Sequence, residues 1–235
     1  MYCLQKHIKM NEDIYKQFIE KASLKQEVFN ETKKVFGSLK KAVATITAAY
    51  AERMEGNHPL VKVEFKDSGD YEARFSYSGD LLLFHMHTNV FNFDNTHRIM
   101  KSKYVKEDPS RAYCCVINVY NFLADSFRFN RVNDAGLLVA RIFINKDQHF
   151  FIEGQKQLNF LYTDFENQVI NEGVFQEIIE NCLKFSLEDE LMCPPYASVK
   201  LASVHQMLSL SSELRLKTAK KLGYSAILKN AEELH

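Results

Sequence analysis

The strongest constraint on this chain is a long helical pattern near its N-terminal end. No proline occurs before Pro59, and a seam repeats at alternating spacings of four and three: Val28, Thr32, Val35, Leu39, Ala42, Ile46 and Ala49. This heptad spacing is typical of a helix that packs along one face. Four large apolar residues widen the seam: Phe29, Phe36, Val43 and Tyr50. That width favours packing on a sheet over pairing with one other helix. The turn residues Gly56 to Pro59 predict the end of the helix.

After Leu60 the pattern changes to the two-residue period of β-strands. Residues 61–65 and 71–77 alternate apolar with polar side chains, and residues 81–90 form a third, more apolar run. Turn residues at 67–70 and 78–80 separate the three runs. Connections this short allow only antiparallel pairing, so we expect an antiparallel meander.

The middle of the chain contains a second predicted meander and one ambiguous stretch. Residues 91–111 are polar and predict no element, whereas residues 112–131 fit either a strand or a helix capped by Asp108 with Pro109 at its first position. We favour the strand. Strand patterns follow at 127–132, 137–144 and 149–153, with turns between them.

Helical spacing returns after Gly154 and continues to Pro194-Pro195, and a further amphipathic helix is expected from Val199 to Leu222. We therefore expect a single α+β domain over residues 1–235. It comprises a helical segment at 1–58, a mostly antiparallel meander of six to seven strands at 60–154, and helices at 155–235. In element order alone, this arrangement is similar to small bacterial chaperone-like modules that dimerise and bind protein segments.

Composition excludes several classes of protein. Hydrophobic residues make up 46% of the chain, which excludes disorder. Lys+Arg and Asp+Glu both number 30, so the chain lacks the basic excess of nucleic-acid binders, although residues 171–196 hold six acidic residues and one basic residue. Residues 1–10 lack a signal-peptide core, and no apolar run is long enough to span a bilayer, so we expect a cytoplasmic protein without membrane contact.

Cysteine and glycine usage gives no indication of a cofactor. The five cysteines form no CxxC pair, so we expect free, mostly buried thiols. The eight glycines form no phosphate-binding loop. Arg128 and Arg131 alternate with aromatic residues, but the balanced charge of residues 111–170 argues against a nucleic-acid surface there.

His85 and His87 form the only spacing typical of metal ligands, because alternate residues of a strand share one face. With Gly79 they resemble the first half of a cupin motif, but Phe91 and Asn92 occupy the positions where a cupin has Glu and Gly. His97 or Asp94 would be the third ligand. The alternative is that both histidines belong to the polar face of a strand, at the rim of a pocket.

Arg141 lies within an otherwise apolar strand and needs a partner. A hairpin at 145–148 would bring Glu153 beside it on the same face. The pair is either a structural salt bridge or an anchor for a ligand carboxylate or phosphate.

Together these features predict a non-catalytic module that binds protein or ligand and self-associates, with a second copy or another protein as its partner. The candidate ligand-binding residues are Arg141, Glu153, His85 and His87. The alternative is a small-molecule or metal-dependent enzyme that uses the sheet face with His85, His87 and Arg141.

Overall fold

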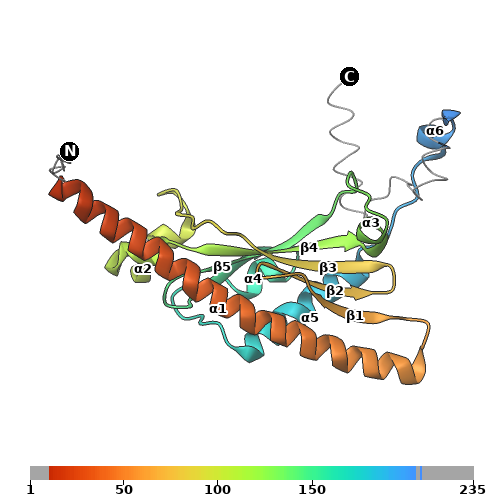
Figure 1. The fold of residues 1–235 in the computed structure, drawn as a ribbon, viewed down its shortest axis with the longest axis horizontal. Helices are drawn as coiled ribbons and strands as arrows, with labels where there is room; N and C mark the ends of the chain where they lie inside the picture. Colours follow the sequence, from red (N-terminus) through yellow and green to blue (C-terminus); the bar gives the residue numbers. More distant parts are fainter. Residues whose placement is uncertain (1–10, 205–206, 208–235) are drawn as a thin grey trace, which may run out of the picture.

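The computed structural model describes residues 11–204 and residue 207 as an α+β fold with one long helix and one sheet (Figure 1). Helix α1 (Glu12–Asn57) precedes six strands in a purely antiparallel meander, in the order β1 to β6. The strands are β1 (Val63–Asp67), β2 (Glu72–Tyr77), β3 (Asp80–Met86), β4 (Cys115–Leu123), β5 (Leu137–Ile144) and β6 (Phe150–Gly154). The predicted fold class is therefore confirmed, with six strands.

Helix α1 begins at an N-cap and packs its seam on the sheet. The Asn11 side chain accepts hydrogen bonds from the backbone N–H groups of Asp13 and Ile14, which satisfies two donors that a helix start leaves open. The buried residues of α1 follow the predicted seam as far as its middle: Val28, Thr32, Val35, Phe36, Leu39, Val43 and Thr47. The buried threonine hydroxyls donate to carbonyl groups one turn earlier, so they are not left unpaired.

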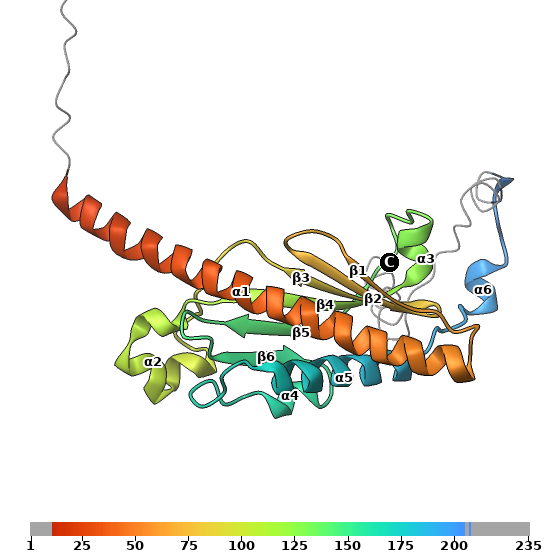
Figure 2. The same ribbon diagram turned by 60° about the horizontal axis from the view of Figure 1, so that its bottom comes forward.

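One face of the sheet carries the main core. Helix α1 and a second helix, α5 (Glu172–Glu188), lie along this face (Figure 2). Alternate residues of the strands belong to one hydrophobic core with residues of these two helices. Large, fully buried side chains of this core include Phe36 of α1 and, from the strands, Phe75, Phe84, Phe150, Leu82 and Ile152. His85 and Arg141 lie on the opposite face.

Within the described residues, helices cover the second face only at its two ends. At one end lie three short helices, η1 (Arg98–Lys101), α2 (Lys103–Glu107) and η2 (Pro109–Ala112), with a small core of their own around Phe143 and Phe151. At the other end, helix α3 (Ala124–Arg128) places Phe127 against the Phe122 ring, with ring centroids 5.2 Å apart. The middle of this face is left for polar side chains.

The structure corrects three local expectations. Residues 91–111 form short helices instead of an irregular segment, because the side chains of Ser102 and Asp108 cap them. The strand expected at 127–132 does not form: residues 127–128 belong to α3, which turns Phe127 back over the sheet, and the residues after them form a turn. The third strand ends at Met86, four residues earlier than expected. No seventh strand forms in the portion of the chain that the structure describes.

Of the ambiguous stretch 112–131, residues 115–123 form the strand β4 and residues 124–128 form α3. The short η2 helix that Asp108 caps precedes β4. Two further helices lie after the sheet, α4 (Leu158–Leu161) and α6 (Tyr196–Val199). Most of the helix expected at 199–222 lies outside the described residues.

Across residues 11–204, no helix combines the length and apolar character needed to cross a bilayer. Three free thiols are buried as expected, those of Cys114, Cys115 and Cys182, whereas Cys193 is exposed. Burial raises the pKa of the Cys115 thiol to about 11 and the pKa of Cys182 to about 12. Cys3 lies outside the described residues.

Candidate functional site

A row of polar side chains crosses the middle of the second sheet face. The strand register places five residues side by side on successive strands from β2 to β6: Glu72, His85, Asn118, Arg141 and Glu153. Directly opposed side chains in a sheet lie within contact range of each other. Three of the four candidate ligand-binding residues therefore share one row, although Asn118 separates His85 from Arg141.

Arg141 and Glu153 form the ion pair that the hairpin predicts. The Arg141 guanidinium donates to Oε2 of Glu153, and the two residues are directly opposed on β5 and β6. The Arg141 side chain is 47% exposed, so this pair lies in solvent rather than in the core. Its contribution to folding stability is therefore small, under about 1 kcal/mol. An anionic ligand at Arg141 would have to compete with Glu153.

His97 extends the row beyond the sheet. Its Nε2 lies 3.4 Å from Oε1 of Glu153, and its ring stacks on Phe93 with centroids 4.6 Å apart. Glu153 thus bridges an imidazole and a guanidinium. The sequence indicates His97 only as a partner for His85 and His87. His97 and Glu153 are 56 residues apart in the sequence, and their contact depends on how the 91–112 segment folds. The sequence shows no regular pattern for that segment.

Among the described residues, no group of three or more His, Cys, Asp or Glu side chains is placed to hold a metal ion, so the structure shows no third ligand beside His85 and His87. His87 lies just past the end of β3, its Nδ1 accepts a hydrogen bond of 3.0 Å from the Asn89 N–H, and its ring contacts Phe91. His97 and Asp94, the expected third ligands, have other partners: Glu153 for His97 and Thr96 for Asp94.

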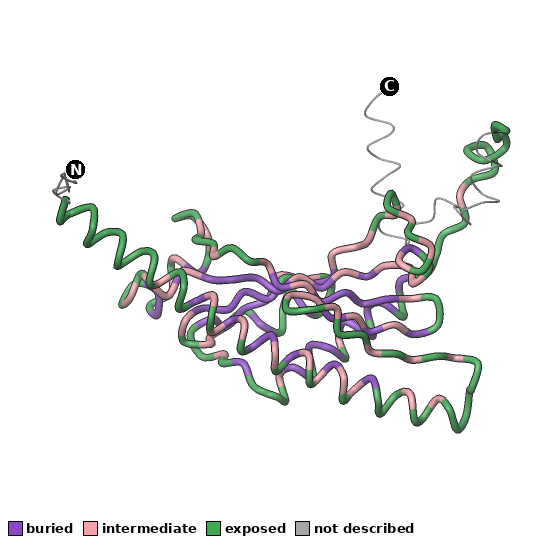
Figure 3. The backbone as a smooth tube through the Cα atoms, viewed as in Figure 1, coloured by how far each residue is buried: buried purple, intermediate pink, exposed green. Residues whose placement is uncertain are grey.

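The N-terminal portion of α1 is a second candidate surface, and sequence periodicity does not distinguish it from the buried seam. Residues 12–27, here called the arm, extend past the end of the sheet and are exposed apart from Leu24 (Figure 3). Ile14 and Phe18 are 66% and 68% exposed, and Tyr15 and Ile19 beside them are also exposed. A cluster of large apolar side chains at a helix surface indicates an interaction site.

The arm continues the same helical stripe that packs on the sheet further along α1. The stripe repeats every seven residues. At this spacing Val28 is preceded by Lys21 and Ile14, and Thr32 is preceded by Lys25 and Phe18. The stripe is therefore buried where the sheet lies beneath it and exposed where the sheet has ended. Lys21 and Lys25 add positive charge to the exposed stretch.

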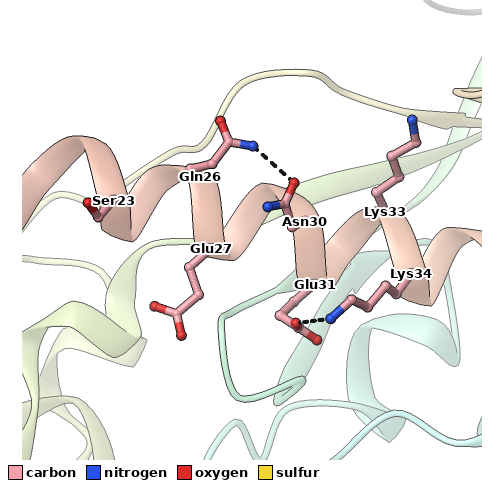
Figure 4. Close-up of a pocket in the computed structure, with 7 residues that line it drawn as sticks. All are labelled: Ser23, Gln26, Glu27, Asn30, Glu31, Lys33 and Lys34. Carbon is pink, nitrogen blue, oxygen red and sulfur yellow. Dashed lines mark hydrogen bonds and ion pairs between the residues drawn. The ribbon is translucent and has the colours of Figure 1, made fainter.

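The hollows along α1 are open rather than enclosed. Figure 4 shows one of about 740 Å³, lined by polar residues that point to different sides of the helix: Ser23, Gln26, Glu27, Asn30, Glu31, Lys33 and Lys34. Another hollow lies between α1 and the loop after β3, where Ala22 and Phe29 meet Val90 and Phe91. Neither would surround a small molecule with converging polar groups, as a ligand pocket does.

A third surface lies at the far end of the molecule. From the last turn of α5 onward, the chain exposes large apolar side chains over residues 187–196: Leu187, Leu191, Met192 and Tyr196. Glu188 and Glu190 in the same segment are exposed acids. Exposed acids are expected at a helix end that lies in water. Large exposed apolar side chains are not expected there, so this segment is a candidate interaction surface.

No family model, curated protein or solved structure matches this chain. Its function is therefore inferred from its own surfaces.

Proposed function

We propose that this protein is a non-catalytic protein-binding module that self-associates through the arm of α1. The observation that carries the proposal is the exposure of Ile14, Tyr15, Phe18 and Ile19 on a helix that continues past its own sheet. Chains rarely leave such a stripe in water unless a partner covers it.

Burying the exposed part of this stripe against a partner favours association. Burying one large apolar side chain stabilises a complex by about 1.5–3 kcal/mol. Because the arm continues a helix whose central part, residues 28–47, packs on the sheet, little conformational entropy is lost when a partner docks. The polar row does not compete as a catalytic site, since its arginine is paired and its hollow by His97 and Glu153 is open.

Light scattering over a range of protein concentrations tests the proposal. The unaltered protein should show a mass approaching twice 27.3 kDa, and Phe18→Glu should shift the dissociation constant at least tenfold upward. The matched control is Leu60→Glu, because Leu60 is 96% exposed on the turn between α1 and β1, away from the arm.

The control should associate like the unaltered protein. Circular dichroism should show that both variants keep the fold, since neither side chain belongs to the core. An unaltered protein that stays at 27.3 kDa at high concentration, or equal association of the two variants, would overturn the proposal.

A further inference from the structure

We propose that the arm of one copy docks on the 187–196 segment of a second copy, and that the two copies exchange this contact in a twofold dimer. The inference rests on the proposed self-association and names its contact surface.

Both surfaces expose large apolar side chains. The arm offers Ile14 and Phe18, and the 187–196 segment offers Leu187, which is 67% exposed, with Leu191 and Met192. Both sets lie in solvent within one copy. Docking them on each other would remove apolar surface of both from water, which is the main favourable contribution to association.

The two surfaces also complement each other in charge. Lys21 and Lys25 lie on the apolar stripe of the arm, whereas the four acids of the arm lie off the stripe by their helical spacing: Glu12, Asp13, Glu20 and Glu27. The 187–196 segment carries the exposed acids Glu188 and Glu190. Glu188, the last residue of α5, pairs with Lys156, so the negative charge that faces a partner comes mainly from Glu190.

The same lysines disfavour the pairing of two arms with each other. In a two-helix dimer along this stripe, Lys21 and Lys25 would occupy the seam between the helices, where unpaired charges are costly. An acidic partner removes this cost. The second copy therefore meets the arm with its acidic segment rather than with its own arm.

The positions of the two surfaces fit a closed dimer. The arm and the segment leading to α6 lie at opposite ends of the molecule (Figures 1 and 2), so one copy cannot join its own surfaces. Two copies placed side by side in opposite directions bring each arm to the partner's 187–196 segment. The contact then occurs twice and the assembly closes. Two contacts bring the buried area closer to the roughly 1,200 Å² of a stable interface than one contact does.

Mixing two charge-reversed proteins tests the inference. One carries Lys21→Glu and Lys25→Glu, and the other carries Glu188→Lys and Glu190→Lys; all four side chains are exposed, so both proteins should fold. Each alone places like charges in both contacts and should dimerise at least tenfold more weakly than the unaltered protein. An equimolar mixture places opposite charges in both contacts, so it should form heterodimers with nearly the original affinity.

Analytical ultracentrifugation of each protein and of the mixture gives the answer, with the unaltered protein as the reference. If the unaltered protein dimerises but the mixture dimerises no better than its separate components, the inference is overturned. The proposed function would then still stand. An unaltered protein that stays monomeric would overturn both.

Discussion

At the level of single residues, the sequence predicts contacts within a hairpin better than contacts between distant segments. The Arg141–Glu153 pair follows from strand alternation and a short turn, both of which are local. The contact of His97 with Glu153 depends on how the 91–112 segment folds back over the sheet, so no spacing in the sequence indicates it. The arrangement of His85 beside Asn118 similarly requires the pairing of β3 with β4.

Asp108 gives a residue-scale prediction on pH dependence. Its carboxylate accepts hydrogen bonds from the hydroxyl and N–H of Ser110 and from the Lys146 ammonium, and these hold the pKa of Asp108 at about 2. Because this pKa is depressed in the folded state, the carboxylate stabilises the fold above about pH 4 and loses that effect as the pH falls toward 2.

Asp108→Asn keeps an acceptor for the Ser110 N–H but removes the charge. Urea unfolding should show the variant less stable than the unaltered protein at pH 6, by under about 1 kcal/mol because the side chain is partly exposed. The difference should shrink toward pH 2.5. A difference that does not change with pH would contradict this account of the carboxylate.

At the level of elements, long periodic patterns predict the structure and short capped ones do not. Helix α1 and the first meander have regular spacing over many residues, and both are found. Of the second meander, the strands expected at 137–144 and 149–153 form, and they join the first meander through β4 in a single sheet. The helices between 98 and 112 are four or five residues each, too short to establish a period. Their caps at Ser102 and Asp108 are the only local signal. In α3, packing of Phe127 on Phe122 prevails over the strand-like alternation of its sequence.

Gly37 gives an element-scale prediction. It lies inside α1, and a Cβ added there would meet no atom within 4 Å, so Gly37→Ala should fit without strain. Alanine restricts the unfolded chain more than glycine does, and the fold should gain about 0.5–1 kcal/mol. Thermal unfolding should then shift upward by about 2–4 °C per kcal/mol.

Gly136→Ala is the matched control, because its Cβ would overlap the Phe122 ring. This variant should be less stable than the unaltered protein by about 1–3 kcal/mol. If both alanine variants shifted the unfolding temperature in the same direction, the packing described around these glycines would be wrong.

At the level of the whole molecule, helices of the chain cover one sheet face, whereas the described residues cover the other face with helices only at its two ends. The sequence indicates that its apolar strands need cover on both faces, and residues 93–112 and α3 supply this at the two ends of the second face. It also predicts packing of the α1 seam on a sheet. It does not show where the sheet ends beneath α1, and that boundary is what leaves Ile14 and Phe18 in solvent.

Hydrogen exchange of the unaltered protein, measured at low and high concentration, tests the central claim most directly. Amides of residues 12–25 and 187–196 should exchange more slowly at high concentration, because docking suppresses the local opening of both segments. The buried stretch of α1, residues 28–47, should change much less, since its own sheet already protects it. Exchange in the arm that is independent of protein concentration would contradict self-association through this surface.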